Sequence, residues 1–330
     1  MKIAITGASG HIGSVLCRKL IEQGHEVTAL VRNSTKSLEG LPLIIQKGNL
    51  LDINSLRLLL KNQDVVIHAA GLIRLGYKFD QQLYDVNVQG TKNIFDISKE
   101  MNIKKIIHFS SIHVYKQKPY NLSISEEREF VDENSVFYDQ TKRDAHLLAI
   151  EAAQGGQNVS IICPTAVIGP HDYMPSKLGR AIKAIHRGLF PVMLKGGFDF
   201  VDVRDVADAT IQTIETGESG ETYIVGGNYH TLKELSDIIL KIKGKKRGII
   251  EVPAFLGRIG IPFIRIYSGI VKKDPIFDNV YLNILLDGNK NIDSEKAVKT
   301  LNHRKTELEK TLKDTIDWFQ NGKNESENDH

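Results

Sequence analysis

The sequence predicts an α/β protein in which a doubly wound parallel sheet is combined with a smaller C-terminal lid. Three observations lead to this fold class. Short runs of strand-forming residues alternate with amphipathic helical runs over the first half of the chain, a glycine-rich turn joins the first strand to the first helix, and the alternation stops after Pro170. Alternating strands and helices form βαβ units with parallel strands and right-handed crossovers.

The bulk composition is that of an ordinary globular protein. Of 330 residues, 41% are hydrophobic and 25% are charged, and the net charge of +3 gives no reason to expect a nucleic-acid partner. The two cysteines, Cys17 and Cys163, lie in apolar surroundings, so we expect small buried side chains, a reducing cytoplasm and no metal site. No signal peptide is expected. No apolar run reaches the ~18 residues of a membrane span. The nearest, residues 254–271, is interrupted by arginines and proline, and we expect a buried helix pair there rather than an interfacial helix.

The expected elements follow from hydrophobic periodicity and from turn residues. Strands are expected at residues 3–6, 26–31, 43–46, 64–68, 105–109, 159–163 and 222–225. Helices are expected from about residue 12 to 20 and at residues 53–61, 84–99, 138–153, 177–187 and 231–242, with a last helix capped by Thr306 and Glu309. Ligands of such sheets bind beyond the carboxyl ends of the strands, where the polar candidate residues below are found.

The glycine-rich turn follows the first expected strand directly and precedes an amphipathic helix. Gly7 allows a tight turn, Gly10 lets the backbone approach a pyrophosphate, and Gly13 lets the helix pack close to the strand. Free N–H groups and the helix dipole then favour phosphate at the helix N-terminus. This strand–turn–helix context predicts a Rossmann-type dinucleotide site rather than a turn without a ligand. The candidate cofactor-binding residues of this stretch are Gly7, Ser9, Gly10, His11, Ile12 and Gly13.

The end of the second expected strand bears on the choice of cofactor. NAD-selective sites usually carry Asp or Glu at this place to hold the ribose hydroxyls, whereas this chain has Arg32, with Lys36 nearby. A guanidinium suits a 2′-phosphate, so we expect NADP, with NAD as the alternative if Arg32 is only a solvated loop residue. Asn49 and Leu50, after the third strand, are expected near the adenine.

Tyr138 and Lys142 form the pair that carries the expected chemistry. They are four residues apart and therefore share one face of the predicted helix. An unperturbed tyrosine has a pKa of ~10, and a nearby cation favours the ionised phenol. Tyr138 then serves as the acid that protonates a carbonyl oxygen during hydride transfer. Lys142 is also a candidate to hold the nicotinamide ribose.

These motifs occur together in a fixed order along nearly the whole chain. The pattern consists of Thr6-Gly7-x-x-Gly10-x-x-Gly13, Ala69-Ala70-Gly71, Asn87-x-x-Gly90-Thr91, Ser110-Ser111-Ile-His-Val-Tyr115, Tyr138-x-x-x-Lys142 and Pro164-Thr-Ala-Val-Ile-Gly169-Pro170. As a set it resembles the extended short-chain dehydrogenase/reductases, the NAD(P)-dependent epimerase/dehydratase family, and within them the dihydroflavonol-reductase-like group. Part of the chain also resembles bacterial proteins described as hopanoid-associated sugar epimerases.

The resemblance implies roles for further residues. Ser111, four residues before Tyr115, is the implied catalytic serine, whose hydroxyl orients the substrate carbonyl. Asn87 lies where the family has an asparagine near the active site and is at most a helper, and Ser110 is expected to be structural. The remaining implied cofactor-binding residues are Ala69, Ala70, Gly71 and Pro164.

Three histidines near the expected strand ends invite a catalytic interpretation. His68 and His108 end apolar strands and are expected to be satisfied core or rim residues. His113 is close to Ser111, and whether it faces the substrate is left open.

The domain division follows from the place where the alternation stops. We expect a dinucleotide-binding domain of residues 1–166 plus about 200–226, a substrate-binding lid of residues 167–199 plus 227–321, and a disordered tail of residues 322–330. A homodimer through the helical stretches that begin at Tyr84 and Tyr138 is expected, although an Ala-rich core helix looks the same.

The reaction implied by these residues is the reduction of a ketone or aldehyde with NADP. The alternative is a nucleotide-sugar epimerase or dehydratase that recycles its cofactor, or, without turnover, a dinucleotide-binding sensor. Sugar-nucleotide members commonly carry an arginine before the strand that returns from the lid, where this chain has Phe198. An aromatic ring does not pair with a diphosphate, so Phe198 favours a small-molecule carbonyl substrate with an apolar part. The alternative is that Arg180 or Arg187, on the expected lid helix, supplies the cation in place of that arginine.

Overall fold

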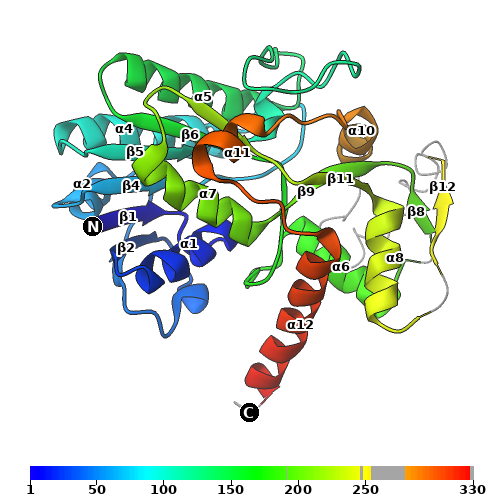
Figure 1. Ribbon diagram of the computed structural model, residues 1–330. Coiled ribbons are helices and arrows are strands. Elements are labelled where there is room, and N and C mark those ends of the chain that lie inside the picture. Colours follow the sequence, from blue (N-terminus) through cyan, green and yellow to red (C-terminus); the bar gives the residue numbers. More distant parts are fainter. Residues whose placement is uncertain (191, 246–247, 254–278, 328–330) are drawn as a thin grey trace.

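A seven-stranded parallel sheet forms the centre of the molecule in a computed structural model that describes residues 1–190, 192–245, 248–253 and 279–327 (Figure 1). The strand order is β3-β2-β1-β4-β5-β6-β10. The strands are β1 (Lys2–Thr6), β2 (Glu26–Val31), β3 (Ile44–Lys47), β4 (Val65–His68), β5 (Lys105–Phe109), β6 (Val159–Pro164) and β10 (Thr222–Val225). The order reverses between β1 and β4, and this switch point is where such sheets bind ligands. The predicted doubly wound fold is confirmed.

Helices cover both faces of the sheet (Figure 1). One face packs against α1 (His11–Glu22), α7 (Val203–Thr216) and α11 (Glu295–Leu301). The other face packs against α2 (Ile53–Leu60), α4 (Gly90–Glu100) and α5 (Phe137–Gln154). Apart from β3 at the edge of the sheet, whose side chains are mostly exposed, the strands are buried on both sides, which is why they read as continuous apolar runs rather than as alternating ones.

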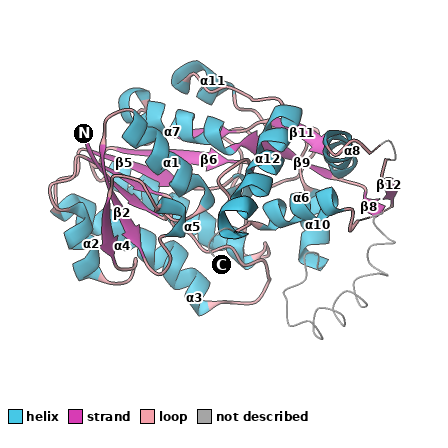
Figure 2. Ribbon diagram, turned by 90° about the horizontal axis from the view of Figure 1, so that it is seen from below, coloured by secondary structure: helices cyan, strands magenta, loops and turns pink. Residues whose placement is uncertain are grey.

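A smaller set of elements lies at one end of the large sheet (Figure 2). It contains a three-stranded sheet, β11-β9-β7, and a two-stranded sheet, β12-β8. The strands are β7 (Ala166–Ile168), β8 (Val192–Leu194), β9 (Gly197–Asp202), β11 (Asn228–Thr231) and β12 (Ile250–Val252), and the helices are α6 (Lys177–Arg187), α8 (Leu232–Ile242), α10 (Asn279–Asp287) and α12 (Leu308–Glu327). Side chains of α6, α8 and α12 share one apolar core. We refer to these elements as the lid.

The helical stretch expected at residues 84–99 differs from the observed one. The helical path begins earlier, with α3 (Gln81–Tyr84), and passes through a π-helical turn, η2 (Asp85–Gln89), before α4. A π turn adds a residue to one helical turn and leaves the apolar pattern on either side intact, so hydrophobic spacing does not reveal it.

The last helix also differs from the expectation. Thr306 does not cap it, because its backbone N–H and its hydroxyl both donate to the Asp205 carboxylate, at 2.7 and 2.9 Å. The carbonyl of Glu307 accepts the first helical bond, from Thr311. The helix continues past the expected end at residue 321 to Glu327. The stretch 254–271 lies outside the described residues.

The turn between β1 and α1 is packed as the glycine pattern predicts. Gly7 has φ of +71°, and a Cβ atom there would lie 2.6 Å from the backbone nitrogen of Ala70. A Cβ atom at Gly13 would overlap the carbonyl oxygen of Gly7. The first strand, the turn and the first helix therefore approach one another more closely than any other residue type permits.

We expect Gly13→Ala to lower the free energy of unfolding by ~1–3 kcal/mol, because the added methyl group must displace backbone atoms. Gly76→Ala is the matched control, since a Cβ atom at Gly76 meets nothing within 4 Å. Urea unfolding of both variants measures the difference. Equal stability of the two variants would contradict the close packing of this turn.

Candidate active site

The N-terminus of α1 presents backbone donors to the expected phosphate site. Gly10 is the N-cap, no side chain caps the helix, and the first helical bond runs from the N–H of Ser14 to the carbonyl of Gly10 at 2.9 Å. The amides of residues 11–13 consequently have no partner inside the helix. The ring of His11 is turned away to the carbonyl of Pro170, with Nε2 at 2.9 Å. The turn therefore fits a pyrophosphate through its backbone, as the glycines predict.

The loop after β2 is attached to this turn. The hydroxyl of the buried Ser37 donates to the carbonyl of Ser9 at 3.0 Å. Arg32 and Lys36 on the same loop are exposed, and neither side chain forms an ion pair with any residue that the structure describes. Two cations are thus available at the carboxyl end of β2, next to the glycine turn.

The two residues expected near the adenine differ in their environments. Asn49 is exposed, and its side-chain oxygen accepts the N–H of Leu51 at 2.9 Å, which leaves the amide NH₂ group as the available donor. Leu50 is buried in the sheet core, and its carbonyl accepts from Asn93 at 2.9 Å. The side chain of Leu50 therefore belongs to the core rather than to the surface of the site.

Ser111, Tyr138 and Lys142 come together where the end of β5 meets the start of α5. All three are buried. Ser111 begins the short 3₁₀ turn η3 (Ile112–Val114), which packs against α5, and its hydroxyl accepts the N–H of His113 at 3.2 Å. The Lys142 ammonium donates to the carbonyl of Phe109, the last residue of β5, at 2.6 Å. Burial lowers the pKa of Lys142 to about 8.

A chain of buried hydrogen bonds leads from β1 to Asn87. The N–H of Ala70 donates to the hydroxyl of Thr6 at 3.3 Å, and this hydroxyl lies 2.7 Å from Nδ1 of His68. Nε2 of His68 lies 2.9 Å from the hydroxyl of Thr91, which donates to the carbonyl of Asn87 at 2.6 Å. Because Thr91 has a single proton and uses it on Asn87, His68 must carry its proton on Nε2 and accept from Thr6 on Nδ1.

The side chain of Asn87 continues this chain of hydrogen bonds to α5. Its NH₂ group donates to the carbonyl of Leu72 at 3.0 Å and to the hydroxyl of Thr141 at 3.1 Å, and its oxygen accepts the N–H of Leu72 at 2.8 Å. Thr141 in turn donates to the carbonyl of Tyr138 at 2.8 Å. Asn87 therefore acts on the loop after β4 and on α5 together, which is a positioning role.

Burial keeps His68 and His108, near the carboxyl ends of β4 and β5, neutral. It lowers the pKa of His68 to about 3, with a smaller contribution from the Lys142 cation. His68 is satisfied on both nitrogens, as expected. His108 is buried too, but neither of its ring nitrogens has a hydrogen-bond partner in the described part of the chain, contrary to the expectation that it is satisfied.

Sequence reasoning missed His146 on α5. Its Nδ1 lies 2.8 Å from the hydroxyl of Ser110, and its Nε2 lies 3.2 Å from the hydroxyl of Thr222 on β10. Ser110 is therefore structural, as expected. The signal was present in the spacing, because Tyr138, Lys142 and His146 recur every four residues along one helix face.

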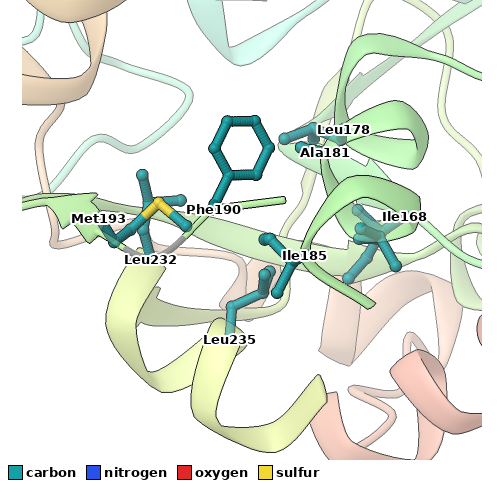
Figure 3. A pocket seen from close by; sticks show the side chains of 9 residues that line it. Ile168, Leu178, Ala181, Ile185, Phe190, Met193, Leu232 and Leu235 are labelled. Atoms are coloured by element: carbon teal, nitrogen blue, oxygen red, sulfur yellow. The ribbon is translucent and has the colours of Figure 1, made fainter. Parts of the chain in front are cut away.

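The lid contributes an apolar cavity of about 20 Å³ (Figure 3). Its walls are Leu178 and Ala181 from α6, Leu232 and Leu235 from α8, and the ring of Phe190. Most of the side chains that line it belong to the apolar core of the lid.

We expect Thr91→Val to lower the free energy of unfolding by ~1–3 kcal/mol, because it leaves the Nε2–H of His68 buried without an acceptor. Thr91→Ser keeps the hydroxyl and serves as the matched variant. Urea unfolding monitored by circular dichroism measures both. A valine variant as stable as the serine variant would show that the chain of hydrogen bonds does not hold the structure.

The searched parts of the chain contain neither a group of three metal-ligating side chains nor a helix long and apolar enough to cross a membrane.

Comparisons with known proteins agree on the family. The model of the NAD dependent epimerase/dehydratase family matches residues 3–226. Sterol demethylase protein B of Methylococcus capsulatus is 29% identical over 325 residues, which covers 97% of this chain and 98% of that protein. A putative dihydroflavonol 4-reductase of Synechocystis is 29% identical over 330 residues, which covers 96% of this chain and 94% of that protein.

Solved structures give the same result for the fold. The crystal structure of gox2253 superimposes with a TM-score of 0.83 at 25% identity, covering 97% of this chain and 98% of that one. UDP-glucuronic acid 4-epimerase of Bacillus cereus, in complex with UDP-glucuronic acid and NAD, has a TM-score of 0.76 at 21% identity and covers 97% of this chain and 99% of that one. The chain therefore belongs to the NAD dependent epimerase/dehydratase family and is an NAD(P)-dependent enzyme of the extended short-chain dehydrogenase/reductase type.

Proposed function

We propose that the protein is an NADP-dependent oxidoreductase that reduces a ketone or aldehyde. The observation that carries the proposal is the gathering of Ser111, Tyr138 and Lys142 where β5 and α5 meet, on the carboxyl-end side of the sheet. A hydroxyl, a phenol and an ammonium in one place supply the donors that a carbonyl oxygen needs as it gains charge.

Each residue has a distinct task in this proposal. Bound NADPH supplies the hydride. Ser111 donates a hydrogen bond to the carbonyl oxygen and orients it, and Tyr138 delivers the proton that converts this oxygen to a hydroxyl. Lys142, held by the carbonyl of Phe109, keeps positive charge near the phenol and so favours its ionised form after the proton has left.

The preference for NADP over NAD rests on the loop after β2. Arg32 and Lys36 are exposed and unpaired within the described chain, on a loop hydrogen-bonded to the glycine turn. A 2′-phosphate would bring a charge that matches them, whereas the ribose hydroxyls of NAD need an acceptor that this loop does not offer at Arg32.

The substrate class is supported by the lid and by relatives. Phe198 on β9 packs against the lid core and lies 5.9 Å from the ring of Phe200. It cannot pair with a diphosphate, which argues against the alternative, a nucleotide-sugar epimerase. Reductase names recur among partial matches as well, such as cinnamoyl-CoA reductase 1 of Petunia hybrida, 29% identical over 185 residues. We further propose a dinucleotide-binding domain of residues 1–166 plus about 200–226, a substrate-binding lid of residues 167–199 plus 227–321, and a cytoplasmic homodimer through α4 and α5.

We expect Tyr138→Phe to lower turnover by about 10²-fold or more while NADPH affinity is kept, because only the proton donor is removed. The measurement follows NADPH absorbance with a panel of ketones and aldehydes, and NADPH fluorescence gives the affinity. Tyr77→Phe, at a side chain that is 56% exposed, is the control. Full activity of Tyr138→Phe would refute the assignment. Micromolar affinity for UDP, or epimerised product without net oxidation of NADPH, would favour the epimerase.

We expect Arg32→Ala to weaken NADPH binding by ~1.5–3 kcal/mol, the usual contribution of a hydrogen bond to a charged group, and to leave NADH binding nearly unchanged. Fluorescence titration with each cofactor measures this, and NADH is the internal control. Equal losses for both cofactors would mean that Arg32 does not contact the 2′-phosphate.

A further inference from the structure

A second titratable pair adjoins Tyr138. Nδ1 of His113 lies 3.3 Å from Oδ1 of Asp139, the residue that follows Tyr138 in the first turn of α5. The rings of His113 and Tyr138 meet edge to face, with their centroids 6.0 Å apart. The backbone N–H of His113 donates to the hydroxyl of Ser111. The imidazole therefore lies against Tyr138, and the backbone of the same residue is bonded to Ser111, the two residues that act on the carbonyl oxygen in the proposed function.

The orientation of the imidazole leaves one nitrogen for a ligand. The Asp139 carboxylate faces Nδ1 and favours a proton on this nitrogen, and Nε2 has no hydrogen-bond partner among the residues that the structure describes. The His113 side chain is 34% exposed, whereas that of Asp139 is 13% exposed. The carboxylate therefore lies on the buried side of the ring, and part of the ring remains open to solvent.

The charges around the ring favour an imidazolium. The Asp139 carboxylate raises the pKa of His113 despite the opposing effect of burial. Tyr138 and Asp139 are the titratable groups that α5 brings to the ring, and the ammonium of Lys142, on the same helix, is bonded to Phe109 instead. When His113 is charged, its free Nε2–H is a charge-assisted donor at the edge of the catalytic group.

We propose that His113 is a specificity-determining residue whose Nε2–H binds a carboxylate next to the reacting carbonyl, so that the substrates are oxo acids. This inference rests on the proposed function. One imidazolium matches one carboxylate in charge and in donor number, whereas a diphosphate needs several cations or backbone donors. A structural role alone would tie η3 to α5 without requiring an open ring nitrogen.

The test compares 3-oxooctanoate with its methyl ester, which lacks the negative charge and is larger by one methyl group. In the native enzyme kcat/KM for the acid exceeds that for the ester, and we expect His113→Gln to lower this ratio at least tenfold while NADPH affinity and the rate with the ester change little. Asp139→Asn removes the charge behind the ring. Asp144→Asn, on the same helix, is the matched control.

The pH profile of the acid-to-ester ratio separates recognition from a structural role. The substrate carboxylate has a pKa near ~4 and stays charged throughout the neutral range. His113 with a raised pKa is charged at low pH, so the preference for the acid is present at low pH and is lost as the pH rises through the pKa of His113. In Asp139→Asn this loss moves to lower pH, and in His113→Gln the ratio no longer varies with pH.

The outcomes distinguish this inference from the function on which it rests. A ratio that is unchanged in His113→Gln, or that is flat with pH in the native enzyme, overturns the role of His113. Turnover of neutral ketones or aldehydes but of neither 3-oxooctanoate nor its ester also overturns it, and leaves the proposed function in place. If no carbonyl compound supports the oxidation of NADPH, the proposed function is overturned, and the inference with it.

Discussion

The site depends on one buried imidazole that is held neutral in a single tautomer. His68 ends β4 at the switch point of the sheet and joins β1, through Thr6, to the helical segment that carries Thr91 and Asn87. Its pKa of about 3 means that no physiological pH charges the ring and reverses its donor pattern. Each hydrogen bond in this chain then has one fixed donor and one fixed acceptor, and this order specifies the geometry as well as stabilising it.

This arrangement affects both the glycine turn and the start of α5. On one side, the N–H of Ala70 is bonded to Thr6, at the point where Gly7 comes so close that no side chain fits. On the other side, Asn87 holds Leu72 and Thr141, and Thr141 holds the carbonyl of Tyr138. The glycine turn and the start of α5 are thus positioned by a shared set of buried groups, and in the proposed function this arrangement would align the cofactor with the proton donor before a substrate binds.

The sequence predicted the parts of this site that depend on local patterns. Gly7 and Gly13 reveal a close approach because only glycine permits it, and the four-residue spacing of Tyr138 and Lys142 places both on one helix face. It did not predict the partner of Lys142, the π turn that carries Asn87, or the hydrogen bonds of Thr306, because those depend on residues distant in the chain. The role of His146 was accessible from spacing alone. The partners of His113 required the packing of η3 against α5.

Following the transferred hydride tests directly whether the enzyme reduces its substrate with net consumption of NADPH. NADPH that carries deuterium on the transferred position of the nicotinamide is incubated with the enzyme and a carbonyl substrate, and mass spectrometry measures the label in the products. We expect one deuterium in each molecule of alcohol and one NADP⁺ for each molecule of alcohol formed. Product without deuterium, formed while the labelled NADPH is not consumed, would contradict it and show a cofactor that is recycled within a closed reaction.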